Sequence, residues 1–167
     1  MIAVRIDDVA FYHGEAIAWP VDAMLGATTP LLRRLELAAG TALGRQAPLR
    51  EPLPVGAAVV TGAGDLHVEL LIHAVIVSPE ERASRDSVRR ALASALQRAA
   101  DFRIDELAVV PFGIGAGNLD LEESAVVMAE VMRQHLARAA HPRSIIVIVE
   151  NDAEEAAWRA AIAREAP

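Results

Sequence analysis

The chain has 167 residues, of which 53% are hydrophobic but only 4% aromatic, so we expect one domain over residues 1–167 with an aliphatic core. Its net charge of −7 repels nucleic-acid phosphates and argues against general nucleic-acid binding. The sequence contains neither cysteine nor lysine, which excludes disulfides, thiolate catalysis, cysteine-bound zinc and a phosphate-binding lysine.

In the N-terminal part we expect two strands and one helix. They are predicted at residues 1–9, 21–25 and 30–39. Residues 15–19 are expected to be irregular, because Pro20 blocks a helix there. Pro30 can open a helix and Gly40 is a stop signal, with leucines at helical spacing between them.

The rest of the chain alternates apolar strands with helices. Strands are predicted at residues 57–61, 66–77, 107–112 and 144–149, and helices from 78, over 121–137 and over 153–164. Residues 62–65 are predicted to form a hairpin turn, and Ser78 to Glu81 resembles a capping box. Residues 44–54, with three prolines, are expected to form a surface loop. This alternation predicts an α/β fold with a central sheet covered on both faces.

The sequence also bears on location. The N-terminus turns acidic at Asp7 and Asp8, where a signal peptide would need an apolar run. No segment approaches the roughly 18 apolar residues of a membrane span. We therefore expect a soluble, cytoplasmic protein that does not bind membranes.

Three segments follow one another in an order that is typical of a known family. The first is Gly14-Glu-Ala-Ile, then after three residues Val21-Asp-Ala-Met-Leu-Gly-Ala-Thr-Thr29. The second is Val55-Gly-Ala-Ala-Val-Val-Thr-Gly-Ala-Gly-Asp-Leu, then Leu71-Ile-His-Ala-Val75. The third is Val110-Pro-Phe-Gly-Ile-Gly-Ala-Gly-Asn-Leu119, before an acidic helix start. They resemble the G-D-I-T and V-D-A-I-V-N-A-A-N, G-x-A-x-x-T-x-G-x-x-L and V-I-H-x-V, and F-P-x-x-G-T-G-x-G-G-x-P segments of the macro domain family.

The resemblance implies a three-layer α/β/α macro domain-like fold with a central mixed sheet and a cleft for ADP-ribose at one end of the strands. Two departures from the family are visible. Gly26-Ala-Thr-Thr29 stands where the family has N-A-A-N, whose last asparagine helps position the distal ribose and the attacking water in hydrolytic members. Pro30 follows at once, so the family's first glycine-rich loop is expected to be deleted.

The expected ligand contacts lie in three places along the chain. They are Glu15, Ala16, Thr28, Thr29, Gly113, Ile114, Gly115, Ala116, Gly117 and Asn118. The glycine loop at 113–118 lies between a buried strand and a helix N-terminus, where backbone amides can converge on a phosphate. By resemblance, Glu15 takes the place of an aspartate that accepts from the adenine amino group, and Ala16 supplies a backbone amide. Thr29 has a competing and preferred interpretation as the helix N-cap.

The predicted function is weak binding of ADP-ribose or a related adenine nucleotide without efficient hydrolysis. The alternative is a degenerate macro domain that serves as a protein-interaction or structural module with no nucleotide ligand, and fold alone does not decide between them. An ADP-ribosyl or O-acyl-ADP-ribose hydrolase is disfavoured, since Thr29 and Glu15 alone are available to position water. No cofactor and no metal site are expected, because the histidines are scattered, and His73 is predicted to be a core residue.

Overall fold

The computed structural model describes residues 1–40, 50–115 and 118–164. The strands are β1 (Ile2–Ile6), β2 (Gly14–Asp22), β3 (Ala58–Gly62), β4 (Val68–Val77), β5 (Glu106–Val109) and β6 (Ser144–Val149). The helices are η1 (Val9–Phe11), α1 (Pro30–Ala39), α3 (Arg85–Asp101), α4 (Leu121–Leu136) and α5 (Asp152–Ala163). Residues 44–49 of the expected surface loop, and Ala116 and Gly117 of the expected ligand loop, lie outside the described residues.

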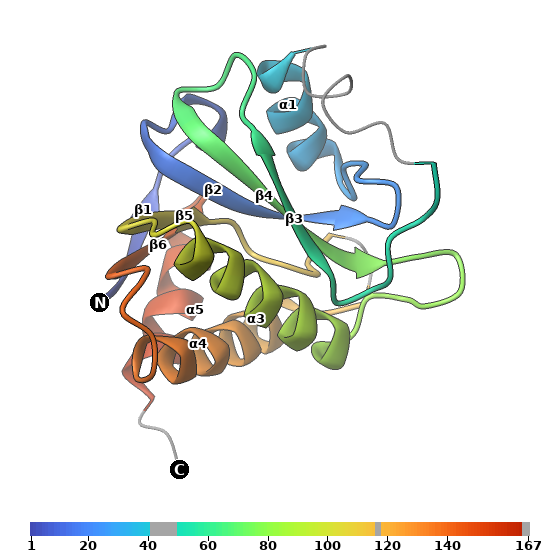
Figure 1. The fold of residues 1–167 in the computed structure, drawn as a ribbon. Coiled ribbons are helices and arrows are strands. Elements are labelled where there is room, and N and C mark those ends of the chain that lie inside the picture. Colours follow the sequence, from blue (N-terminus) through green and yellow to red (C-terminus); the bar gives the residue numbers. More distant parts are fainter. Residues whose placement is uncertain (41–49, 116–117, 165–167) are drawn as a thin grey trace.

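The strands form one mixed sheet in the order β1-β6-β5-β2-β4-β3 (Figure 1). Strand β3 pairs antiparallel with β4, while the other neighbouring pairs are parallel. The carboxyl ends of β1, β6, β5, β2 and β4 therefore lie along the same edge of the sheet. This arrangement confirms the predicted central mixed sheet.

Helices cover both faces of the sheet, so the three-layer α/β/α prediction is also confirmed (Figure 1). Strand β2 shows how the sequence achieves this. Ala16 and Ala18 point into the core beneath α3, α4 and α5, while Ile17 and Trp19 point into the core beneath α1. All four side chains are fully buried, which explains why the central strands are continuously apolar and not alternating.

The prediction for β2 was wrong in its boundaries. The strand covers residues 15–19, which were expected to be irregular, and it ends at Asp22 rather than at residue 25. Pro20 is tolerated because β5 pairs with β2 only along residues 16–18. The Ala18 carbonyl points toward β5 and accepts from the Val110 N–H. Pro20, two residues on, presents its missing N–H to the same side, where β5 has already ended.

The start of α3 was also predicted too early. Ser78 accepts hydrogen bonds from the N–H groups of Glu80 and Glu81, but this closes only an isolated turn. The helix begins after Ser84, whose hydroxyl accepts from the Ser87 N–H while the Ser87 hydroxyl accepts from the Ser84 N–H. The third helical residue of a capping box is usually Glu or Gln, so the serine at position 87 makes this capping box difficult to recognise in the sequence.

Within the described part of the chain, no helix has both the length and the apolar composition needed to cross a membrane.

Candidate ligand-binding cleft

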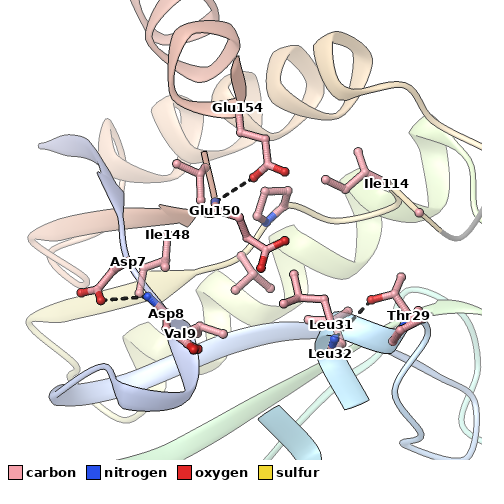
Figure 2. A pocket seen from close by; sticks show the side chains of 15 residues that line it. Asp7, Asp8, Val9, Thr29, Leu31, Leu32, Ile114, Ile148, Glu150 and Glu154 are labelled. Atoms are coloured by element: carbon pink, nitrogen blue, oxygen red, sulfur yellow. Dashed lines mark hydrogen bonds between the residues drawn. The ribbon is translucent and has the colours of Figure 1, made fainter. Parts of the chain in front are cut away.

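A cavity of about 220 Å³ opens where the carboxyl ends of β1, β5 and β6 face the N-terminus of α1 (Figure 2). Its walls come from four short segments and one side chain of α5. They are residues 7–9, 29–32, 110–111 with 114–115, 148–150, and Glu154. Ligand sites of open α/β sheets lie at this edge, outside the carboxyl ends of the strands.

The loop after β5 gives the cavity a glycine-lined wall. Gly115 lines the cavity with φ of +71°, and a Cβ added there would lie 3.2 Å from Cγ2 of Thr29. Gly113 has φ of +82°, but its missing side chain would point at Leu119 and Val88 in the core. The structure thus brings together Thr29, Ile114 and Gly115 of the predicted contacts. Gly113 is required by the packing and does not line the cavity.

The outer part of this loop is held by the core. The side-chain amide of Asn118 donates to the Ala83 carbonyl at 2.7 Å. Asn118, which was predicted to contact the ligand, therefore attaches the loop to the segment before α3. At the other end, the Phe112 carbonyl accepts from the buried Ser124 hydroxyl at 2.7 Å. These two bonds anchor the loop at Phe112 and at Asn118.

The N-terminus of α1 contributes less to anion binding than a helix end usually does. Thr29 is the N-cap, as preferred from the sequence, and its hydroxyl accepts from the Leu32 N–H at 3.2 Å. Pro30 has no N–H, and the Arg33 N–H donates to the Thr29 carbonyl. Of the first four helical residues, Leu31 is the one whose N–H is left for a ligand. Thr28 adjoins the cavity without lining it.

The connection from β2 to α1 corrects one expectation. Because β2 ends at Asp22, seven residues, 23–29, lead to α1, so the first loop is present and not deleted. This loop contains a single glycine, Gly26, and is therefore not glycine-rich. Oδ1 of Asp22 accepts from the N–H groups of Met24 at 2.8 Å and Gly26 at 2.9 Å, which closes the start of the loop.

Glu15 and Ala16 lie at the amino end of β2, away from the cavity. The Glu15 carboxylate accepts from the N–H groups of Asp105 at 3.0 Å and Glu106 at 3.1 Å. Ala16 is fully buried and pairs with Leu107 of β5. The structure therefore does not bring these two predicted contacts together with Thr29 and Gly115.

Sequence reasoning missed the acidic residues of the cleft. Asp7 and Asp8 follow β1, Glu150 follows β6, and Glu154 is in the first turn of α5. The signal was a carboxylate directly after a β-branched strand, which in a parallel sheet falls at the ligand edge. Asp8 pairs with Arg34 of α1 at 2.7 Å. The other three form no ion pair with the described residues, and no described residue of the cavity wall is basic.

A buried polar network lies in the core beneath α1, separate from the cleft. His73 is 2% exposed, accepts from the Trp19 indole N–H at Nδ1 (2.9 Å) and contacts the Thr61 hydroxyl through Nε2 (2.7 Å). Since Nδ1 accepts, the neutral ring carries its proton on Nε2 and donates to Thr61, which in turn donates to the Gly62 carbonyl. Burial lowers the pKa of His73 from 6.5 to about 4. The predicted core role of His73 is confirmed.

The chain is similar to proteins of several prokaryotes. It is 28% identical over 166 residues to a protein of Mycobacterium tuberculosis, covering 95% of this chain and 46% of that protein. It is 31% identical over 134 residues to a protein of Aquifex aeolicus, covering 80% of this chain and 79% of that protein. The chain thus spans about half the length of the mycobacterial relatives it matches.

Solved structures share the fold. A Trypanosoma brucei macrodomain in complex with ADP-ribose superposes with a TM-score of 0.83 at 17% identity, covering 95% of this chain and 68% of that one. The Macro domain family model matches residues 33–128, more than half of the sequence. The chain belongs to the macro domain family.

Proposed function

We propose that this protein binds ADP-ribose or a related adenine nucleotide, weakly and without efficient hydrolysis. The observation that carries the proposal is the cavity between the glycine loop after β5 and the carboxyl ends of β1 and β6. The Trypanosoma brucei relative, whose structure contains ADP-ribose, has the same fold. The alternative of a module without a ligand would be favoured by a cleft filled with side chains, and this cleft is open.

The adenine end is assigned to Asp8. The family segment D-A-I-V-N-A-A-N can also be matched to Glu15-Ala-Ile-Ala-Trp-Pro-Val-Asp22, a register that coincides with β2. In that register the aspartate of G-D-I-T falls on Asp8, shortly after β1, which replaces Glu15 as the carboxylate that accepts from the adenine amino group. Oδ1 of Asp8 accepts from the Ala10 N–H at 3.0 Å and Oδ2 accepts from Arg34 at 2.7 Å, which orients the carboxylate at the cavity wall.

The phosphates are assigned to the backbone of Ile114 and Gly115, and the distal ribose to the neighbourhood of Thr29. Glycine at position 115 lets the backbone approach a phosphate without a Cβ in the way. Compared with a glycine-rich first loop, the α1 end offers Leu31 alone as a free amide. Each lost bond to a charged group is worth roughly 1.5–3 kcal/mol. One or two such losses lower affinity by about ten- to a thousandfold, which places it between micromolar and millimolar.

Hydrolysis needs a group that positions water beside the distal ribose. In the register above, Asp22 stands in the place of the family's last asparagine, and its carboxylate closes the start of the first loop. The Thr29 hydroxyl already accepts from its own helix. With both groups engaged in the local structure, turnover is expected to be slow or absent.

NMR titration tests this proposal and suits weak binding. Adding ADP-ribose to ¹⁵N-labelled protein should shift the amide signals of Asp8, Leu31, Ile114 and Gly115. Asp8→Ala should weaken binding about tenfold through loss of one acceptor. Glu69→Ala removes an exposed carboxylate at the opposite edge of the sheet and should change nothing. Shifts that map elsewhere, or no shifts at millimolar ligand, would refute the assignment.

A further inference from the structure

The two glutamates of the cleft line the same cavity as Ile114 and Gly115, to which the phosphates are assigned. Figure 2 shows the carboxylates of Glu150 and Glu154 turned toward the middle of the cavity, between Ile114 and Leu31. Glu154 is held in this position because its Oε2 accepts from the Glu150 N–H at 3.0 Å and its Oε1 from the Asn151 side chain at 3.4 Å. These two hydrogen bonds at the start of α5 therefore fix the orientation of the Glu154 carboxylate.

Neither glutamate is neutralised within the described part of the chain. Arg34, on α1, is paired with Asp8, and none of the described residues that line the cavity is basic. A phosphate bound to the amides of Ile114 and Gly115 would thus stand opposite two unpaired negative charges. Backbone amides attract any phosphate, whereas these carboxylates raise the cost of each further negative charge on the ligand.

We propose that Glu150 and Glu154 form a charge filter that selects adenine ligands without a terminal phosphate over nucleoside di- and triphosphates. The proposal rests on the proposed function and names the ligand class. Each phosphate of ADP-ribose has one ester bond and shares the anhydride bond between them, so each carries one charge, while the terminal phosphate of ADP or ATP carries about one additional charge at neutral pH. If the added charge stands about 8 Å from one carboxylate, affinity falls by about two- to thirtyfold, depending on the local dielectric.

Competition titrations with ADP-ribose, ADP and ATP test the filter. The wild-type protein should bind ADP at least threefold and ATP at least tenfold more weakly than ADP-ribose. Raising the salt from about 50 to about 500 mM should narrow these ratios, because screening weakens the repulsion. In the Glu150→Gln/Glu154→Gln variant the ratios should fall at least about threefold. Glutamine at position 154 keeps one acceptor oxygen for the Glu150 N–H, the shorter of the two bonds, and the Asn151 cap to the Glu154 N–H is unaffected.

Glu69→Gln is the matched control, since it removes one charge at the opposite edge of the sheet and should leave both ratios unchanged. If ADP-ribose binds but ADP and ATP bind equally well, or if the double variant keeps the wild-type ratios, the filter is refuted while the proposed function stands. If none of the three ligands binds, the proposed function itself fails.

Discussion

Replacing Gly115 with valine tests directly whether the loop after β5 contacts a ligand. The backbone at Gly115 has φ of +71°, a left-handed conformation that costs a residue with a Cβ about 1–2 kcal/mol. The new Cβ would also lie 3.2 Å from Cγ2 of Thr29, the N-cap of α1. Loss of that cap would add about 1 kcal/mol. The expected loss of stability, about 2–3 kcal/mol, is smaller than the stability of an ordinary domain.

As a fraction of the whole, the loss of binding free energy should be larger than the loss of stability. If Gly115 and Ile114 hold a phosphate, displacing their amides removes at least one charged hydrogen bond, and affinity for ADP-ribose falls at least about tenfold. Calorimetric titration of the folded variant, with urea unfolding to confirm its stability, measures both quantities. Gly56→Ala is the control. It also has a positive φ of +95°, and its new Cβ would lie 2.9 Å from Nη1 and 3.1 Å from Cβ of Arg90, away from the cavity.

The reasoning would be refuted by a folded Gly115→Val protein that binds ADP-ribose with wild-type affinity. An equal loss of affinity in Gly56→Ala would show that general destabilisation, and not the loop, controls binding.

Two further predictions concern stability. Because the pKa of His73 falls from 6.5 to about 4 on folding, its contribution is fully present above about pH 6.5 and is lost as the pH falls toward about 4, by about 3 kcal/mol in total. Urea unfolding across this range should show that loss in wild type and in His67→Gln but not in His73→Gln, and identical pH profiles would contradict it. Thr29→Ala should lower the free energy of unfolding by about 1 kcal/mol, whereas Thr29→Ser, which keeps the hydroxyl acceptor, should restore most of it; equal stability of both variants would exclude the capping role.

The fold was predictable because its signals are repeated over many residues. Apolar runs such as Ser144–Val149, a strand predicted with its observed bounds, alternate with amphipathic helices, and this order leaves few topologies. Where a single residue decided the interpretation, prediction failed. Pro20 was used to exclude a helix, and residues 15–19 were expected to be irregular; they form a strand instead, and Pro20 is accommodated because the neighbouring strand β5 ends before it. Which strands flank a residue, and where they end, is a property of the sheet and not of the local sequence.

The site was harder to predict than the fold. The glycine loop and the N-cap Thr29 were found because both have a local mechanism, namely positive φ and a capping hydroxyl. Glu15 was misplaced because the family segments were first matched to β2 in a different register. The Glu15 carboxylate lies at the edge of the sheet opposite to the cavity. The acidic wall of Glu150 and Glu154 was missed, although Glu150 carried a signal as a carboxylate directly after a strand; that both residues line one cavity with the loop after β5 follows only from the fold.

Calorimetric titration of the wild-type protein with ADP-ribose up to millimolar concentration, with AMP as the comparison ligand, tests the central claim most directly. The account predicts saturable binding in the micromolar-to-millimolar range that is tighter for ADP-ribose than for AMP. No heat and no thermal shift with either ligand would contradict it, and the cleft would then have to be regarded as a degenerate remnant in a module that binds other proteins.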